Sequence, residues 1–225
     1  MCFNHARHLC IGTAVLAAVL WSGGAARAAR DQERVVDQVA AVVNEQIVTL
    51  IDVQVVAAFG IFESILPSDA DNARRAILEK LIDLKAVLDL VRDRAPVDPA
   101  RIEAEIGRII ARLGEEGFRA RLSAFGFARE DLKPYLEEKL QVETIVGERF
   151  GRSVTVGLKE IEARYQDRIV SADRSAGREP RPFLSVVDAL EKEIRAEKIT
   201  VQAAFWIQSL REQAEIEIRP GVLKK

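Results

Sequence analysis

Residues 35–53 constrain the fold of this chain more than any other stretch. Valines separated by small alanines at its start favour extended structure over helix. Because asparagine tolerates left-handed backbone, Asn44-Glu45-Gln46 predicts a tight turn after this run. A return strand starts at Ile47. Thr49 then stands three residues before Asp52, the spacing at which an N-cap side chain and a first-turn carboxylate satisfy free helix amides. The stretch predicts strand, turn, strand and helix start in that order.

Two short strands are not stable alone in water, so the hairpin needs a further partner. Residues 215–219, Glu-Ile-Glu-Ile-Arg, alternate polar and apolar side chains near the other end of the chain. We therefore expect the two ends to pair. The predicted fold class is mainly α: a helical body with a small β-sheet, formed by an N-terminal hairpin and a C-terminal strand.

Residues 1–29 have the layout of a signal peptide. Arg7 precedes an apolar run from Leu9 to Trp21, and small residues follow up to Ala28 and Ala29. The run is short for a membrane span, so we expect cleavage after Ala28 or Ala29, with an uncleaved anchor as the alternative. Export by this route predicts a periplasmic protein.

Removal of the signal peptide limits the chemistry of the mature chain. Both cysteines and both histidines lie before Arg30. The expected chain therefore has no disulfide, cysteine nucleophile, serine–histidine triad or ordinary zinc site. Without Arg7 and Arg27, 31 basic residues face 35 acidic ones, a net charge of −4. Nucleic-acid binding relies on basic surface patches that neutralise phosphates, so we expect no nucleic-acid partner for a chain with negative net charge.

The middle of the chain predicts amphipathic helices. Apolar residues from Ile77 to Val91 and from Ile102 to Leu113 recur every three or four positions. Asp98 and Pro99 supply an N-cap and a first-turn proline for the second of these helices. A short helix is expected to end at Gly126, and another to begin near Asp131. We assign residues 30–170 to one helical domain.

Residues 171–182 are polar, contain glycine and two prolines, and lack an apolar period, which predicts a linker. Residues 183–225 are expected to complete the same domain. They comprise helices over 183–197 and 200–214, followed by the strand.

Several segments in this order resemble the SurA-type periplasmic chaperones. The first is VDQVAAVVNEQIVTLIDV; the next are ILEKLIDLKAVLDLV and FRARLSAFGFAREDLKPYLEEKLQVETIV; the last are VTVGLKEIEARYQDRI and AAFWIQSLREQAEIEIRP. Many members of that family carry a parvulin-type prolyl isomerase domain between the last two segments. Here residues 171–182 stand in its place, so the resemblance is to a peptide-binding module without the isomerase.

The resemblance implies an ATP-independent holdase that needs no cofactor. Its partners would be unfolded polypeptides, above all outer-membrane protein precursors, with transient proximity to the membrane surface. Two alternatives stay open: a prolyl isomerase-family protein with residual activity, and an envelope adaptor with one fixed partner. The sequence does not specify the oligomeric state.

Aromatic residues near predicted helix ends are the candidate peptide-binding residues, and ordinary core packing is the alternative for each of them. They are Phe59, Phe62, Phe118, Phe125, Phe127 and Tyr135. If they are exposed, such residues form an apolar groove of the kind that marks interaction sites. Adjacent carboxylates such as Glu115-Glu116 and Glu137-Glu138 point about 100° apart on a helix, so they do not predict a joint acid–base site. We assign no catalytic or metal-binding residue.

Overall fold

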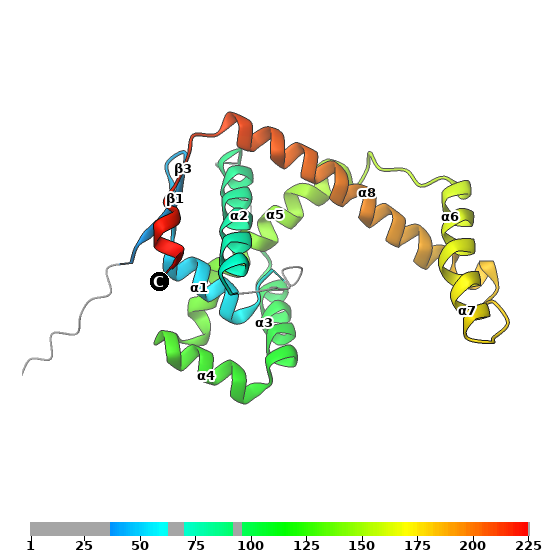
Figure 1. Ribbon diagram of the computed structural model, residues 1–225, viewed down its shortest axis with the longest axis horizontal. Helices are drawn as coiled ribbons and strands as arrows, with labels where there is room; N and C mark the ends of the chain where they lie inside the picture. The colour runs from blue at the N-terminus through cyan, green and yellow to red at the C-terminus, as the bar shows by residue number, and fades with distance from the viewer. Residues whose placement is uncertain (1–36, 63–69, 92–95, 225) are drawn as a thin grey trace, which may run out of the picture. The chain divides into compact units, whose positions relative to one another are not determined.

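The computed structural model describes residues 37–62, 70–91 and 96–224. The predicted signal peptide, with both cysteines and both histidines, lies outside the described residues. The described part is mainly helical and carries one small antiparallel sheet, which confirms the predicted fold class. Figure 1 shows the helices and the strands β1 and β3.

The sheet joins the two ends of the described chain. Strand β1 (Val39–Val43) lies between β2 (Gln46–Thr49) and β3 (Ile216–Ile218). In the β1–β3 pair, Ala41 lies opposite Ile218 and Val43 opposite Ile216. The predicted pairing of the C-terminal strand with the hairpin is confirmed. The turn between β1 and β2 places Asn44 at a φ of 52°, the left-handed region expected there.

The helix start after the hairpin is also confirmed. Helix α1 (Leu50–Phe59) begins where the Asp52 amide donates to Thr49 Oγ1 at 3.2 Å, and the Thr49 amide donates to Asp52 Oδ2 at 2.8 Å. The helix ends at Gly60, whose φ of 57° is the left-handed conformation common after a helix terminus. A reciprocal cap therefore fixes the position at which the chain leaves the sheet.

The central helices are α2 (Ala70–Asp89), α3 (Pro99–Leu113), α4 (Glu115–Phe125) and α5 (Lys133–Phe150), with a 3-10 turn η1 (Arg129–Leu132) before α5. They bury one apolar cluster with the sheet and α1. Its largest fully buried side chains are Val43, Val48, Val53, Val55, Val56, Phe59, Leu78, Ile82, Ile106, Leu132 and Leu136. Asp98 caps α3 as predicted, since its carboxylate accepts from the Ala100 amide at 2.9 Å.

The C-terminal part differs from the expected pair of helices. Helix α8 (Phe183–Gln213) is continuous where two helices over 183–197 and 200–214 were predicted. Residues 197–200 contain neither glycine nor proline, so nothing in the backbone ends the helix there. The Lys198 side chain also binds the segment before helix α6 (Leu158–Arg164), because its Nζ donates to Thr155 O at 2.9 Å. The predicted break between residues 197 and 200 was wrong.

The segment predicted as a linker is folded. Helix α6 (Leu158–Arg164) runs into the π-helical turn η2 (Tyr165–Val170) and then α7 (Ser171–Ser175). Asp173 is buried and accepts from the backbone and Nε of Arg181 and from Arg178. Residues 171–182 are thus mostly exposed, but they form a short helix and a turn that is held by the ion pairs of Asp173.

A second, smaller apolar cluster lies between α6, η2 and the first half of α8. It is built on Ile161, Leu190 and Ile194. The chain ends with β3 and a short 3-10 turn η3 (Pro220–Lys224). Among the described residues, no helix combines the length and the apolar character needed to cross a bilayer.

Candidate functional site

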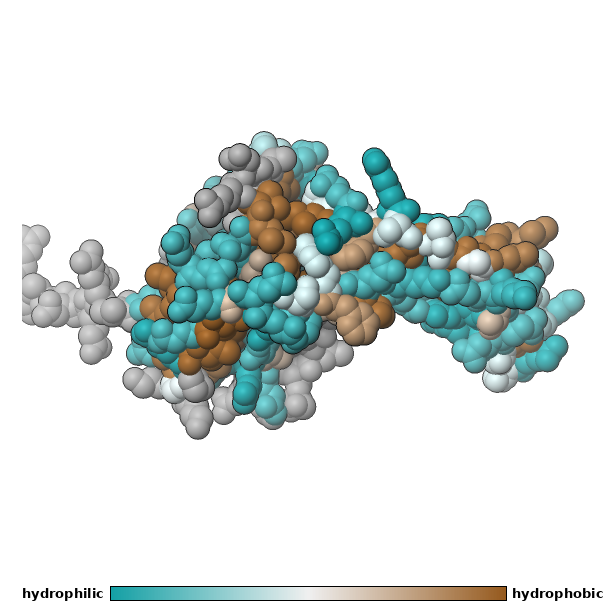
Figure 2. All heavy atoms as spheres, turned by 90° about the horizontal axis from the view of Figure 1, so that it is seen from above, coloured by the Kyte–Doolittle hydropathy of each residue, from teal (hydrophilic) through white to brown (hydrophobic). Residues whose placement is uncertain are grey.

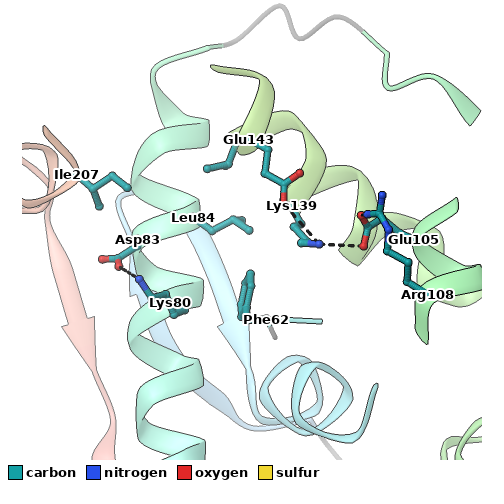
Figure 3. Close-up of a pocket in the computed structure, with 10 residues that line it drawn as sticks. Phe62, Lys80, Asp83, Leu84, Glu105, Arg108, Lys139, Glu143 and Ile207 are labelled. Carbon is teal, nitrogen blue, oxygen red and sulfur yellow. Dashed lines mark hydrogen bonds and ion pairs between the residues drawn. The ribbon is translucent and has the colours of Figure 1, made fainter. Parts of the chain in front are cut away.

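A cleft of about 580 Å³ opens between α2, α3, α5 and α8, and we call it the large cleft. Four of the side chains that line it are apolar and six are charged. They are Phe62, Leu84, Val142 and Ile207, then Lys80, Asp83, Glu105, Arg108, Lys139 and Glu143. In Figure 3, Phe62 and Leu84 point toward the side of the cleft on which Lys139 and Glu105 are joined.

The charged side chains of the large cleft are paired with one another. Glu105 is only 5% exposed, and it binds both Arg108 and Lys139, the latter with 3.0 Å between Nζ and Oε2. Lys139 also lies 3.5 Å from Glu143. Lys80 lies 3.7 Å from Asp83. Because three basic side chains offset three acidic ones, the large cleft has no net charge.

The apolar lining of the large cleft remains partly accessible. Phe62, Val142 and Ile207 are only partly buried, whereas Leu84 is buried beneath them. An apolar side chain that enters the cleft would therefore meet hydrocarbon from three separate segments of the chain. Its burial would be favourable by about 25 cal/mol per Å² of apolar surface removed from water.

A smaller cleft of about 360 Å³ lies beside the hairpin, between α2 and the start of α5, and we call it the small cleft. Its lining is aromatic, aliphatic and acidic. The residues are Val48, Asp52, Leu81, Lys85, Phe127, Asp131, Pro134, Tyr135 and Glu138. The Tyr135 hydroxyl donates to Asp52 Oδ1 at 3.1 Å. Asp52, which takes part in the cap of α1, therefore also binds a residue of α5. Burial and the nearby negative charge of Asp52 raise the pKa of Tyr135 far above its ordinary value.

The structure divides the six predicted aromatic residues between the core and two clefts. Phe59 and Phe118 are 0% and 3% exposed, with ring centroids 5.7 Å apart in an edge-to-face arrangement. For these two candidates the structure shows the alternative, burial in the core. Phe59 lies one turn after Val55 on the same helix face, so it continues the buried stripe of α1 to its end.

The other four predicted residues do not form one groove. Phe125 lies 6.1 Å from Phe59 and 5.7 Å from Phe127, measured between ring centroids, and is packed against the core. Phe127 and Tyr135 line the small cleft. Phe62 lines the large cleft. The two clefts therefore take different members of the predicted set.

Sequence reasoning missed most of the apolar lining of the large cleft. Leu84 and Ile207 belong to helical stripes that were expected to be ordinary core, and Val142 was not singled out. It also missed three exposed residues of α8, Leu184, Val201 and Phe205, which are 83%, 54% and 75% exposed. The spacing of apolar residues shows which face of a helix points inward. It does not show whether other segments cover that face completely. Figure 2 shows hydrophobic residues interrupting the hydrophilic surface on the face that it views.

Within the ranges that the structure describes, no group of three or more histidine, cysteine, aspartate or glutamate side chains is placed to hold a metal ion. Neither adjacent carboxylate pair forms a joint site there: Glu115 and Glu116 are exposed in the first turn of α4, and Glu138 is paired with Lys85.

Neither the models of known protein families nor the curated proteins compared with this chain give a match.

Proposed function

We propose that this protein is an ATP-independent holdase chaperone that binds unfolded polypeptides in the large cleft. One observation carries the proposal: Phe62, Val142 and Ile207 present a partly accessible apolar surface, while each of the six charged side chains of the cleft already has an ion-pair partner. An unfolded chain exposes the apolar side chains that such a surface would cover. A cleft with no net charge does not demand one particular charged group, which suits clients of varied sequence.

The resemblance to the SurA-type chaperones supports the location and the clients that we propose. A signal peptide over residues 1–29 would direct the protein to the periplasm. The proposed clients are unfolded envelope proteins, above all outer-membrane protein precursors. Their strands alternate apolar and polar residues, so an extended segment offers an apolar side chain at every second position.

Aggregation suppression tests the proposal directly. The full chain should reduce light scattering by several unrelated proteins diluted from denaturant. The double variant Val142→Thr, Ile207→Thr keeps the side chains branched but places hydroxyl groups in the large cleft. It should need about fivefold more protein for the same suppression, because two apolar contacts are weakened. Unfolding curves of the variant establish that the comparison is between folded proteins.

The matched control is Val201→Thr, Ile47→Thr, which makes the same two changes at exposed positions outside the large cleft. This control should suppress aggregation like the unaltered chain. If the two double variants behave alike, the large cleft is not where clients bind. Suppression of a single protein and no other would favour the adaptor.

The isomerase alternative has its own measurement. We expect no acceleration of the cis–trans isomerisation of proline peptides by the full chain. A rate above background that disappears when the protein is unfolded would favour an isomerase in place of the holdase.

A further inference from the structure

The small cleft differs from the large cleft in its walls. Phe127 and Tyr135 contribute flat aromatic rings, and Val48, Leu81 and Pro134 contribute aliphatic groups. Phe127 and Tyr135 are partly buried, so part of each ring remains accessible. A long, unbranched side chain can lie along such walls with its methylene groups out of water.

The small cleft also differs in its charge. Three of its lining residues are acidic and one, Lys85, is basic. Lys85 Nζ is already bound by both carboxylate oxygens of Glu138, at 2.6 and 2.8 Å. Asp52 and Asp131 therefore account for a net charge of −2.

Neither of these two carboxylates has a basic partner among the described residues. Asp52 accepts from the Thr49 amide and the Tyr135 hydroxyl, and Asp131 accepts from the Ala128 amide at 2.7 Å. Asp131 is exposed at the rim. Close by in sequence, the guanidinium of Arg129 is paired with Glu103 on α3.

The raised pKa of Tyr135 has burial and nearby negative charge as its causes. Burial is the largest cause of its raised pKa, and the charges of Asp52, Asp37 and Glu138 raise the pKa further. An excess of negative charge beside accessible aromatic faces attracts a cation from two directions, through Coulomb attraction and through the cation–π interaction.

We propose that the small cleft binds an arginine or lysine side chain of an extended polypeptide, with its methylene stem against Phe127 and Tyr135 and its cationic head toward Asp131. That the ligand is a polypeptide rests on the proposed function. The cation requirement rests on the lining of the small cleft alone. The protein would thus hold a client through an apolar residue in one cleft and a basic residue in the other.

Peptide binding to the full chain tests this proposal. The probe is a dye-labelled, N-acetylated and C-amidated peptide of alanine, serine and glycine with one central arginine, compared with the same peptide carrying citrulline. Citrulline keeps the length and shape of arginine without its charge. The arginine peptide should bind at least about fivefold more tightly at low salt, and added salt should reduce that preference. Equal binding of the two peptides, or binding of neither, would overturn the proposal.

The variant Asp131→Asn removes one charge and keeps an oxygen that can accept from the Ala128 amide. Asp98→Asn is its matched control, because Asp98 is likewise an exposed residue accepting from a backbone amide, at the start of α3 and outside the small cleft. Asp131→Asn should lose most of the preference for arginine, and Asp98→Asn should keep it. Equal effects of the two variants would refute the role of Asp131.

The two proposals fail separately. A preference for arginine with no suppression of aggregation would overturn the holdase and leave the cation site standing. Suppression of aggregation that depends on Val142 and Ile207, with no preference for the arginine peptide, would overturn the cation site and leave the holdase standing.

Discussion

Asn44 and Glu215 lie 171 positions apart and are joined by two hydrogen bonds. The Asn44 amide donates to Glu215 O at 2.8 Å, and the Glu215 amide donates to Asn44 Oδ1 at 2.9 Å. The side-chain Nδ2 of Asn44 also donates to Asp89 Oδ2 at 2.6 Å. One turn residue thus binds the last strand and the end of α2 to the hairpin.

Asn44→Gly should destabilise the fold without straining the turn. Glycine adopts the left-handed φ of 52° readily, so the variant loses mainly the two side-chain hydrogen bonds. We expect the free energy of unfolding to fall by about 1–2 kcal/mol in denaturant titrations. Glu45→Ala, at the exposed neighbouring position, is the control. An equal loss in both variants would mean that the Asn44 side chain does not join the chain ends.

Phe59 and Phe127 should respond differently to truncation, although both were predicted to bind peptide. Phe59→Ala removes a fully buried ring and should cost about 3–5 kcal/mol of unfolding free energy. Phe127→Ala removes a partly exposed ring and should cost about 1–2 kcal/mol. Chemical denaturation of the two variants measures the difference. Similar losses would place Phe127 in the core with Phe59.

Arg211 holds α8 to α2, because its guanidinium donates to Asp83 Oδ1 at 2.8 Å and to Glu79 Oε2 at 2.7 Å. Asp83 also lines the large cleft. Arg211→Met should therefore lower the unfolding free energy by about 1–2 kcal/mol and weaken aggregation suppression, since Ile207 lies on the same helix.

The control for Arg211 is Arg219→Met. Arg219 is ion-paired with Glu217 and both side chains are more than half exposed, so its removal should change stability by less than about 0.5 kcal/mol. If Arg211→Met is as mild as this control, the ion pairs of Arg211 do not position α8.

Asp173 should make the stability of the C-terminal part depend on acid pH. Its hydrogen bonds with Arg181 are the largest cause of a lowered pKa, and the charges of Arg181 and Arg178 lower it further. A pKa that is lower in the folded state means that Asp173 stabilises the fold above its unfolded pKa of about 3.9. This contribution is lost as the pH falls through the folded value.

The variant Asp173→Asn should therefore be less stable than the unaltered chain near neutral pH. The gap should narrow below about pH 4, in unfolding curves recorded across the acid range. Asp167→Asn, at an exposed position of η2, should show no such gap. A gap that stays constant down to about pH 2 would show that the charge of Asp173 is not its cause.

Local signals in the sequence determined the parts of the fold that depend on few residues. Three of these signals specify backbone conformation through neighbouring atoms. They are the valine-rich run that ends at Asn44, the Thr49–Asp52 cap, and the polar–apolar alternation of residues 215–219. The pairing of the tail with the hairpin followed, because short strands need partners and few candidates existed. Helical periodicity likewise placed Ile77, Leu81 and Ile106 on buried faces.

Tertiary structure decided which residues pack against the apolar face of each helix. Phe59 and Ile207 are both apolar residues of helices, yet Phe59 packs against Phe118 in the core and Ile207 borders an open cleft. The large cleft takes its apolar lining from α2, α5, α8 and the residues that directly follow α1. The buried ion pairs of Glu105 and Asp173 likewise need partners brought together by folding. Burial depends on how many atoms from distant segments fill the space around a side chain, and local sequence does not contain that number.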